Sequence, residues 1–401
     1  MKLLLYSHFF APSVGGVETV VLSLARGLSE RRDARGLAEF EVTLVTQTPA
    51  GNYDDSSLPF RVVRRPGYVQ LWRLIRSCDV AHVAGPALAA VFLARLARKP
   101  YLIEHHGYQA ICPNGLLFHH PANSVCPGHF QAGNYLECMN CNTKIEGHLG
   151  ALRLLASTFL RRAGSCCAPA NIAPSHHVAA RLDLPRTAVI FHGVADPFAA
   201  AKGKKETPAL ENSNFAYVGR LVAEKGVSVL LEAVRLLRAE GRAVKVLIIG
   251  DGPERVRLEK RIAASHLEPC IRITGFLSGE ALEHELRKVS TIVIPTIMEE
   301  TAGLAALEQM ARGRLVIASA VGGLKEIVEG AGLVFPPGDS LALADTMRRV
   351  LDEPGLASSL AALGRQRVLQ KLFFETMIDA HAALYRELYA RPLKKAPNRK
   401  S

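Results

Sequence analysis

Short apolar runs alternate along the chain with longer segments in which apolar residues recur every three or four positions. Buried β-strands are predicted at KLLLYS, FEVTLVT, DVAHVA and PYLIEHH, and a helix with one buried face is predicted at VETVVLSLARGLSERR. Strands that alternate with helices indicate βα units around a parallel sheet, in which ligands bind at the carboxyl ends of the strands. The first run is interpreted as a strand rather than a signal peptide, because Ser7 and His8 interrupt it.

The same pattern begins again after a polar segment. Residues 198–213 are small, polar and charged and predict a linker, and the strand-like runs NFAYVGR, VKVLIIGDGP, IRITGF, TIVIPT and LVIASA follow it. We therefore predict an α/β protein with two Rossmann-like, doubly wound domains, at residues 1–197 and 214–370. A C-terminal helix over 371–390 is expected to pack back toward the first domain, and a basic, disordered tail is expected over 391–401.

Composition agrees with two globular domains. Of the 401 residues, 49% are hydrophobic and 21% are charged, which excludes the disordered class. No apolar run reaches the roughly 18 to 20 residues that a membrane span needs, so a cytoplasmic protein, soluble or peripheral to the membrane, is expected. Eight cysteines without a signal peptide indicate reduced thiols.

The formal charge of +12 is unevenly distributed. Residues 1–197 carry +6 and residues 391–401 carry +5, whereas residues 214–390 are neutral. This surplus favours an anionic partner, namely a nucleic acid, a membrane surface or a phosphorylated substrate. We expect no nucleic acid, because the basic residues form neither an aromatic-interleaved stripe nor a recognised binding module.

Two motifs have the composition of anion-binding turns. Gly15 and Gly16 lie between the first strand and the first helix, where glycine lets the backbone approach an anion closely, although a tight βα turn is an alternative. Arg220 and Lys225 in GRLVAEKG follow the first strand of the second domain. Two cations there can neutralise a diphosphate, although exposed Arg and Lys are usually solvated surface.

A third motif, EETAGLAALEQMARG, places Glu300 and Glu308 eight residues apart around a helix start. The backbone amides of Ala302, Gly303 and Leu304 are expected to be available to a phosphate. Glu308 occupies an otherwise apolar helix face and needs a partner, either ribose hydroxyls or a structural salt bridge.

Together with IIGDGPER, SAVGGLKEIV and GLVFPPGD, these motifs make the chain resemble retaining glycosyltransferases of the GT-B fold (glycosyltransferase family 4, group 1 type) over nearly its whole length. The resemblance implies two Rossmann-like domains facing across a cleft. It implies transfer of a hexosyl-type sugar, with retention of configuration, from a nucleotide-diphosphate sugar to a hydroxyl of a glycan or lipid-linked acceptor in cell-envelope, polysaccharide or lipopolysaccharide biosynthesis. No catalytic metal is implied.

The resemblance also implies roles for individual residues. It places Gly15 and Gly16 beside the donor diphosphate, Arg220 and Lys225 on its charge, and the amides of Ala302, Gly303 and Leu304 around its phosphates. It further assigns Glu300 to the donor sugar, Glu308 to the ribose and His106 to the reacting sugar and acceptor.

Alternatives remain at two of these positions, and the motif departs from the family at two others. Spacing favours Glu300 over Glu299. The six residues from His106 to Cys112 resemble a His-to-Cys-Pro spacing found in part of this family, and this resemblance favours His106 over His105. Ala302 stands where the family usually has a large apolar residue, and Gln309 where it usually has a small one. Both departures bear on the choice of donor.

Four cysteines lie in one Gly- and Pro-rich stretch: Cys112, Cys126, Cys138 and Cys141. They can form a structural zinc site that fastens a long loop, with His119, His120 and His129 as alternative ligands. Reduced thiols and disulfides remain alternatives. The other four cysteines, Cys78, Cys166, Cys167 and Cys270, are expected to be core thiols.

One hypothesis competes with the transferase, and the partner that the basic charge favours remains to be named. A non-catalytic nucleotide-sugar-binding protein would account for Ala302 and Gln309 as marks of a degraded site. The basic first domain and tail favour an anionic membrane surface that carries the acceptor, and a basic surface that only aids solubility is the alternative.

Overall fold

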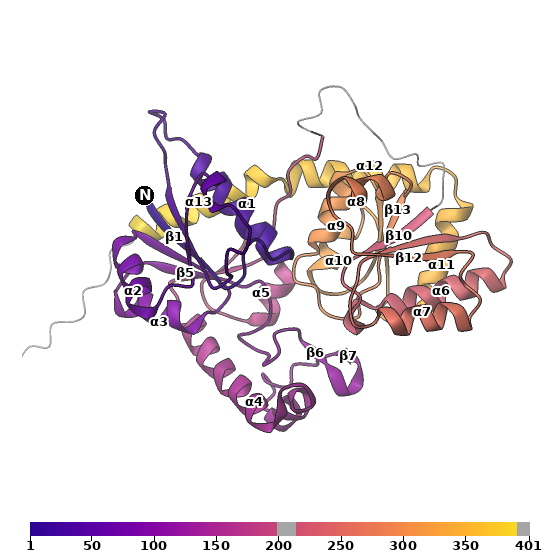
Figure 1. Cartoon of the computed structure of the whole chain (residues 1–401), viewed down its shortest axis with the longest axis horizontal. Helices are drawn as coiled ribbons and strands as arrows, with labels where there is room; N and C mark the ends of the chain where they lie inside the picture. The colour runs from indigo at the N-terminus through magenta and orange to yellow at the C-terminus, as the bar shows by residue number, and fades with distance from the viewer. Residues whose placement is uncertain (199–213, 391–401) are drawn as a thin grey trace, which may run out of the picture. The chain divides into compact units, whose positions relative to one another are not determined.

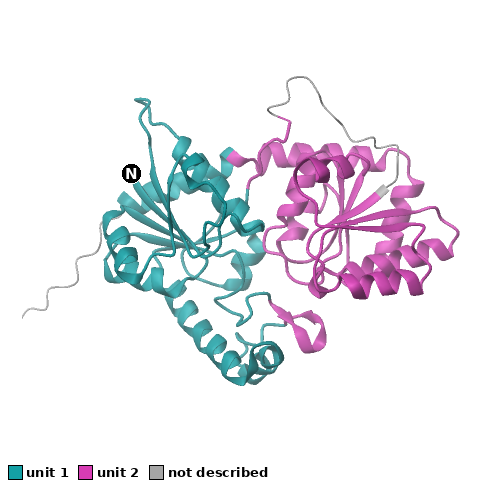
Figure 2. Cartoon of the chain, in the orientation of Figure 1, with its two compact units in different colours: residues 1–116, 127–192, 375–401 teal, residues 117–126, 193–374 magenta. Residues whose placement is uncertain are grey.

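A computed structural model describes residues 1–198 and 214–390, which form two compact units (Figure 1, Figure 2). Unit 1 comprises residues 1–116, 127–192 and those from 375 onward, and unit 2 comprises residues 117–126 and 193–374. The predicted linker, except residue 198, and the predicted tail lie outside the described residues.

Unit 1 is built on a sheet of seven parallel strands in the order β3-β2-β1-β4-β5-β8-β9. The predicted first strand is confirmed, since it lies inside this sheet and pairs with both β2 and β4. The strands are β1 (Lys2–Ser7), β2 (Glu41–Thr46), β3 (Arg61–Arg64), β4 (Val80–Ala84), β5 (Tyr101–Glu104), β8 (Ala170–Ala173) and β9 (Thr187–Val189).

The helices of unit 1 connect these strands, except the last, which comes from the far end of the chain. They are α1 (Gly16–Glu30), α2 (Tyr68–Ser77), α3 (Leu88–Leu96), α4 (Tyr135–Cys166), α5 (His176–Leu182) and α13 (Phe374–Ala390), with the 3-10 turn η1 (Asp55–Ser57). Helix α4 is kinked at Gly147, where φ is +71°. Helix α13 joins unit 1 through ion pairs from Asp379 to Arg31 and from Arg386 to Glu39.

Unit 2 repeats the design with six parallel strands in the order β12-β11-β10-β13-β14-β15. They are β10 (Asn214–Val218), β11 (Lys245–Ile249), β12 (Ile271–Gly275), β13 (Thr291–Ile294), β14 (Leu315–Ser319) and β15 (Leu333–Phe335). A separate antiparallel pair, β6 (Phe118–His119) and β7 (Ser124–Val125), and the turn η2 (His120–Ala122) belong to the excursion at 117–126.

Seven helices and a 3-10 turn complete the described part of unit 2. They are η3 (Ala223–Lys225), α6 (Val227–Ala239), α7 (Arg255–Ala264), α8 (Gly279–Leu286), α9 (Leu304–Ala311), α10 (Gly322–Val328), α11 (Ser340–Asp352) and α12 (Leu356–Lys371). In the part of the chain that the structure describes, no helix combines the length and apolar character that crossing a bilayer requires.

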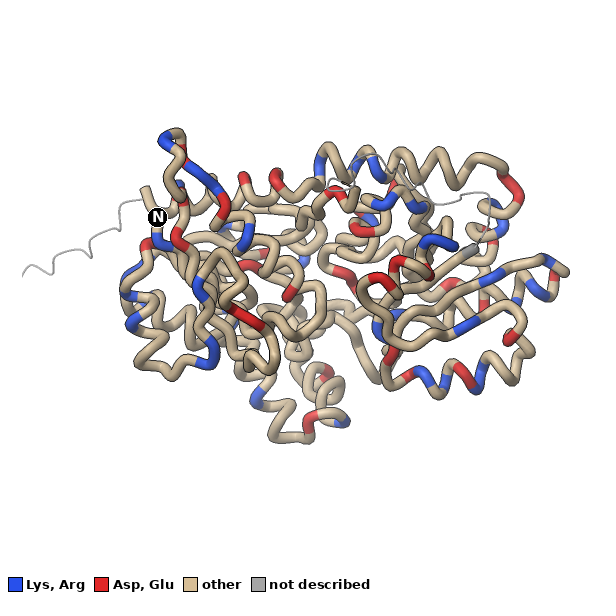
Figure 3. Tube along the Cα trace, turned by 45° about the horizontal axis from the view of Figure 1, so that its top comes forward, with Lys and Arg blue, Asp and Glu red and all other residues tan. Residues whose placement is uncertain are grey.

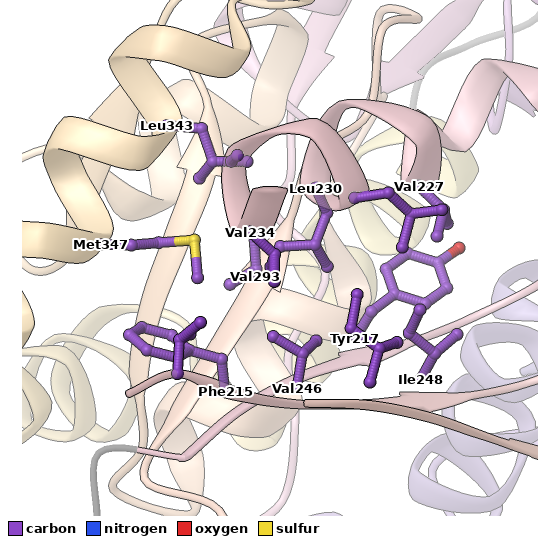
Figure 4. Close-up of a cluster of buried hydrophobic side chains, with 14 of the residues drawn as sticks. Phe215, Tyr217, Val227, Leu230, Val234, Val246, Ile248, Val293, Leu343 and Met347 are labelled. Atoms are coloured by element: carbon purple, nitrogen blue, oxygen red, sulfur yellow. The ribbon is translucent and has the colours of Figure 1, made fainter. Parts of the chain in front are cut away.

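The core of unit 2 lies between the sheet and its covering helices (Figure 4). Phe215 of β10 and Ile248 of β11 meet Leu230 of α6 and Met347 of α11, and all four side chains are fully buried. Burying one such side chain stabilises the fold by about 1.5 to 3 kcal/mol. The buried alternation of strand and helix residues is what the apolar pattern predicts.

The strand order locates the ligand-binding edge of each unit. In both sheets the chain moves outward in one direction from the first strand and then returns to its other side, so the order reverses between β1 and β4 and between β10 and β13. Open α/β sheets bind ligands beyond the carboxyl ends of the strands at such a reversal. The predicted site residues must therefore be sought in the loops that follow these strands.

Candidate functional site

The loops that follow β10 and β13 in unit 2 are bound tightly to each other. The carbonyl oxygen of Glu224 accepts hydrogen bonds from Thr296 Oγ1 at 3.1 Å and from the Ile297 amide at 2.9 Å. Gly226 lies in the left-handed region with φ +66°, and a Cβ there would be 1.9 Å from the carbonyl oxygen of Pro295. Only glycine permits this approach.

The loop after β11 packs against the first of these loops in the same way. A Cβ on Gly250 would lie 1.8 Å from the Gly219 oxygen, and one on Gly252 would lie 2.4 Å from the Leu221 oxygen. The Leu221 amide also donates to Asp251 O at 2.9 Å. These close contacts explain why glycine stands at both positions of the GDG in IIGDGPER, which the sequence pattern alone did not explain.

The predicted cation and carboxylate meet where these loops converge. Lys225 Nζ forms an ion pair with Glu300 Oε1, and the two side chains remain 29% and 17% exposed. A lysine ammonium has three donors, so this pairing leaves others for an anion. Glu299 is buried and Glu300 is not, so the structure places Glu300 against Lys225.

The backbone of Glu300 is held from a fourth loop that was not assigned a role from sequence. The Gly323 amide donates to Glu300 O at 2.7 Å, and a Cβ on Gly322, where φ is +60°, would lie 2.3 Å from the same oxygen. The two glycines of SAVGGLKEIV therefore fix the position of the carboxylate-bearing loop.

Helix α9 begins beside this pair with uncapped amides. Gly303 is its N-cap with φ +55°, and no side chain caps the helix. Among the described residues, the N–H groups of Ala302, Gly303 and Leu304 donate to no acceptor. Free amides and the positive end of the helix dipole favour a phosphate at this point.

Glu308 lies one turn further along α9 and is half-buried. Burial raises the pKa of its carboxyl, an effect that Arg312 opposes. Arg312 forms its ion pair with Glu283, and within the described ranges the Glu308 carboxylate makes no salt bridge. The structural salt bridge that was the alternative for Glu308 is therefore not formed, and the carboxylate is available to a ligand.

Arg220 is exposed at the end of β10, and its guanidinium has no hydrogen bond or ion pair within residues 1–198 and 214–390. Its carbonyl oxygen is held instead, because Tyr217 Oη donates to it at 2.7 Å. Burial, followed by the nearby charge of Glu300, raises the pKa of Tyr217, so the phenol remains a donor.

Gln309, one of the two departures from the family pattern, has a structural role. Its Oε1 accepts from Arg314 Nη1 at 2.9 Å, and the Arg314 guanidinium also donates to the oxygens of Leu286 and Val289. Both side chains are buried, and burial lowers the pKa of Arg314 to about 10. Gln309 therefore accepts a hydrogen bond from a buried cation, which gives this departure a structural reason.

The predicted glycine pair in unit 1 stands at the first reversal point. Gly15 is the N-cap of α1 in an extended conformation, and no side chain caps this helix. A Cβ on Gly15 would lie 2.4 Å from Glu18 Oε2. The amides of Gly15 and Gly16 donate to no acceptor in the described residues, which leaves a second uncapped helix start.

Two adjacent histidines follow β5, and the structure distinguishes them. His105 is completely buried, and its Nε2 lies 3.0 Å from Asn171 Oδ1. His106 lies beside the buried Glu104, with its Nε2 3.7 Å from Glu104 Oε2. Burial lowers the pKa of both histidines to about 4. Neutral imidazoles are therefore expected at both positions near pH 7.

The four cysteines of the predicted zinc site are divided between the units. Cys112, Cys138 and Cys141 are buried in unit 1, and Cys126 is grouped with unit 2. Asn114 connects two of them, since its Oδ1 accepts from Cys112 Sγ at 3.0 Å and its Nδ2 lies 3.7 Å from Cys141 Sγ. The zinc site stays a prediction.

The expectation for the remaining cysteines is only partly right. Cys78 and Cys270 are buried, Cys166 is half-buried, and Cys167 is exposed. The expectation of a core thiol is wrong for Cys167, because this residue follows the last turn of α4 at the surface.

Sequence comparison gives a match to each half of the chain. Residues 14–196 match glycosyltransferase family 4, and residues 200–367 match glycosyl transferases group 1. An alpha-D-kanosaminyltransferase of Streptomyces kanamyceticus is 36% identical over 174 residues, which are 43% of this chain and 45% of that protein. The amylovoran biosynthesis glycosyltransferase AmsK of Erwinia amylovora is 30% identical over 178 residues, 43% of this chain and 42% of that protein. The chain thus spans less than half the length of these relatives.

Solved structures resemble the chain over almost its whole length. HepE of Anabaena, crystallised with UDP and glucose, superposes with a TM-score of 0.70 at 17% identity, covering 96% of this chain and 100% of that one. Sucrose-phosphate synthase of Thermosynechococcus elongatus has the same TM-score at 22% identity, covering 97% and 99%. At these identities the likeness shows the fold, which is the GT-B architecture of two Rossmann-like domains.

Proposed function

Because the chain belongs to the glycosyltransferases that join a family 4 segment to a group 1 segment, we propose that it transfers a sugar from a nucleotide-diphosphate donor to an acceptor hydroxyl. The observation that carries this proposal is the arrangement in unit 2. The Lys225–Glu300 pair, the uncapped start of α9 and the Glu308 carboxylate all lie in or directly after the loops at the reversal of strand order.

The chemistry of these groups fits a nucleotide-diphosphate sugar. The amides from Ala302 to Leu304, with Lys225 and Arg220, supply donors and positive charge for a diphosphate. The carboxylate of Glu308 suits ribose hydroxyls, and that of Glu300 suits a sugar hydroxyl. A ligand of this class is also bound by structural neighbours of the same fold, among them HepE in complex with UDP-glucose.

The reaction follows from where charge develops. As the glycosidic bond to the diphosphate breaks, negative charge accumulates on the leaving phosphate, and preorganised donors stabilise it there. The acceptor hydroxyl approaches the face that the diphosphate leaves, and the diphosphate helps to remove its proton, so the sugar keeps its configuration. His106 is proposed to contact the reacting sugar and acceptor. Arg220, Lys225 and the α9 amides take the role that a metal ion has in other transferases.

The proposed acceptor is a glycan or lipid-linked hydroxyl of the kind used in polysaccharide or cell-envelope biosynthesis. One of the matched relatives is named for amylovoran biosynthesis. Retention, the hexosyl type of the sugar and this acceptor class are parts of the proposal.

Unit 1 carries a surface suited to an anionic membrane, on which a lipid-linked acceptor would lie. Helices α2 and α3, with the residues that follow α3, line an open hollow of about 520 Å³. Its lining includes Trp72, Phe92 and Leu96 together with Arg76, Arg95 and Arg98. Phe92 is 64% exposed and Leu96 59%. Aromatic and aliphatic side chains together with arginines suit an anionic lipid–water interface, where each basic residue contributes about 1 kcal/mol.

The charge distribution also favours unit 1 for this contact, because residues 1–197 carry +6. In unit 2, Lys and Arg as well as Asp and Glu are distributed along the chain (Figure 3), and residues 214–390 carry no net charge. Sedimentation with vesicles of neutral or anionic lipid tests the membrane proposal. Binding to anionic vesicles is expected to fall when Arg95 and Arg98 are changed to Glu, and equal binding to both vesicle types would refute it.

The transferase is tested by incubating the purified chain with a panel of nucleotide sugars and of lipid-linked and free glycan acceptors. Release of nucleoside diphosphate that depends on the acceptor, with an NMR spectrum showing the donor's anomeric configuration in the product, is the expected result. Donor binding without release under any condition would favour the non-catalytic nucleotide-sugar-binding protein. A product of opposite configuration would overturn retention alone.

A further inference from the structure

A buried carboxylate in unit 1 is surrounded by four histidines that the proposed transfer reaction does not need as a group. Glu104 ends β5 and is 0% exposed. His82 Nε2 lies 2.9 Å from its Oε2 and His381 Nε2 3.6 Å from the same oxygen. On the other side, His192 Nε2 lies 3.6 Å from Oε1, and His106 lies near Oε2. Every one of these rings directs Nε2 at the carboxylate.

The outer nitrogens of the two deepest rings are held by neighbours on α13. His82 Nδ1 lies 2.7 Å from the Tyr385 hydroxyl, and His381 Nδ1 lies 2.8 Å from the carbonyl oxygen of Met377. A carbonyl can only accept, so His381 Nδ1 carries a proton. In the neutral ring the lone pair on Nε2 then faces the carboxylate, an arrangement that needs a cation between the two groups.

The His381 distance distinguishes a metal ion from a proton. An imidazolium bound to a carboxylate would show a charge-assisted hydrogen bond of about 2.7 to 2.9 Å. The His82 contact of 2.9 Å fits such a bond, whereas the His381 contact of 3.6 Å does not. In residues 1–198 and 214–390, neither oxygen of Glu104 and neither Nε2 of His82 and His381 makes a hydrogen bond of acceptable geometry. Two ligands each about 2.0 to 2.2 Å from a shared ion lie about 2.8 to 3.8 Å apart at angles of about 90 to 120°. The observed spacings of 2.9 and 3.6 Å match this range.

We propose that His82, Glu104 and His381 form a binding site for a divalent first-row metal ion of the Zn²⁺ class. The ligand atoms lie within 4.8 Å of one another, and all three side chains are buried. Two imidazoles and one carboxylate are a ligand set that zinc commonly takes, and Tyr385 and the Met377 carbonyl are the outer partners that usually orient metal-bound histidines.

The site would fasten the end of the chain to the first sheet. Its ligands come from β4, β5 and α13, and His381 is 277 residues beyond Glu104 along the chain. An ion that binds only the folded arrangement stabilises it in proportion to its occupancy. The proposal is therefore structural and does not depend on sugar transfer, so its failure and that of the proposed function are distinguishable.

Metal analysis of the full chain tests the proposal. Purified without chelators and exchanged against Zn²⁺, the chain is expected to retain about one ion at this site. To separate it from any ion at the cysteines, the measurement is made on a Cys138→Ser, Cys141→Ser variant. In that background His82→Gln or His381→Gln is expected to lose the ion. The matched control is His105→Gln, a buried histidine beside Glu104 whose Nε2 lies against Asn171, and it is expected to keep the ion.

Cobalt substitution tests the ligands without changing any histidine. Added to the metal-free cysteine variant, Co²⁺ is expected to give visible d–d absorption without thiolate-to-cobalt charge-transfer bands, and Zn²⁺ is expected to abolish it. The melting temperature should fall on chelation and return with Zn²⁺ in this variant. No bound zinc after exchange, or the same zinc content and cobalt spectrum in the His82→Gln, His381→Gln double variant, would overturn the site and leave a cluster that holds protons.

Discussion

The substitution Gly226→Ala tests how the loops that follow β10 and β13 are held together. Gly226 follows Lys225 directly, and its φ of +66° lies in the left-handed region, where an L side chain costs about 1 to 2 kcal/mol. Its new Cβ would lie 1.9 Å from the Pro295 oxygen, and real Cβ contacts do not fall below 3.0 Å. The loops after β10 and β13 must therefore separate by about 1.1 Å.

That separation acts on the ion pair, because Lys225 lies on one loop and Glu300 on the other. A misplacement of about 1 Å in a catalytic constellation can cost on the order of 100-fold in rate. We expect the Gly226→Ala variant to lose about 100-fold in kcat/KM once a donor is known, with weaker binding of nucleoside diphosphate by isothermal titration calorimetry. Thermal unfolding records the accompanying loss of stability.

Gly241→Ala is the matched control. Gly241 also lies in unit 2 with φ +77°, but a Cβ there meets nothing within 4 Å. It should share the backbone strain and the loss of stability that follows from it, and should bind nucleotide like the unmodified chain. If Gly226→Ala binds nucleotide as tightly as Gly241→Ala, the close packing of the two loops is not what positions the site.

Three other predictions follow from single contacts. Gln309→Leu should lower the free energy of unfolding by about 1 to 3 kcal/mol in urea titrations, because it leaves the buried Arg314 guanidinium short of an acceptor; a change below about 0.5 kcal/mol would be that of an ordinary surface substitution. Glu308→Gln should reduce about 10-fold the preference of the chain for binding a ribonucleoside diphosphate over a 2′,3′-dideoxyribonucleoside diphosphate, which corresponds to about 1.4 kcal/mol in binding free energy. An unchanged ratio of the two dissociation constants would show that Glu308 does not bind the ribose hydroxyls. Cys138→Ser with Cys141→Ser should abolish any zinc bound at the cysteine cluster, and undiminished total zinc by elemental analysis would show that these thiols bind none.

Much of the fold could be predicted from local pattern. The alternation of strands and helices follows from the spacing of apolar residues that are close together in the sequence. Both parallel sheets and the helix start at Gly303 could therefore be predicted. The strand order makes the carboxyl ends of β10 and β13 adjacent. This is why Lys225 and Glu300, 75 residues apart, form a pair that motif spacing alone did not predict.

Other features depend on tertiary contacts that leave no local signal. Gln309 looked like a departure from a family motif, and only the fold shows that it satisfies Arg314. His82 and Glu104 lie in runs predicted to be buried strands, where a polar side chain is unusual and could have been noticed. His381 lies on a helix far along the chain, and no spacing rule connects it to them.

Sugar transfer at the Lys225–Glu300 pair is tested most directly by the rate of nucleoside diphosphate release from a donor that the chain turns over. Lys225→Ala and Glu300→Gln should each reduce acceptor-dependent kcat/KM by about 100-fold or more, since each removes a group that we propose acts on the reacting donor. The control variants Lys260→Ala and Glu353→Gln change exposed residues elsewhere in unit 2. They should release nucleoside diphosphate at the rate of the unmodified chain. Release by Lys225→Ala and Glu300→Gln at the unmodified rate would contradict the proposed site.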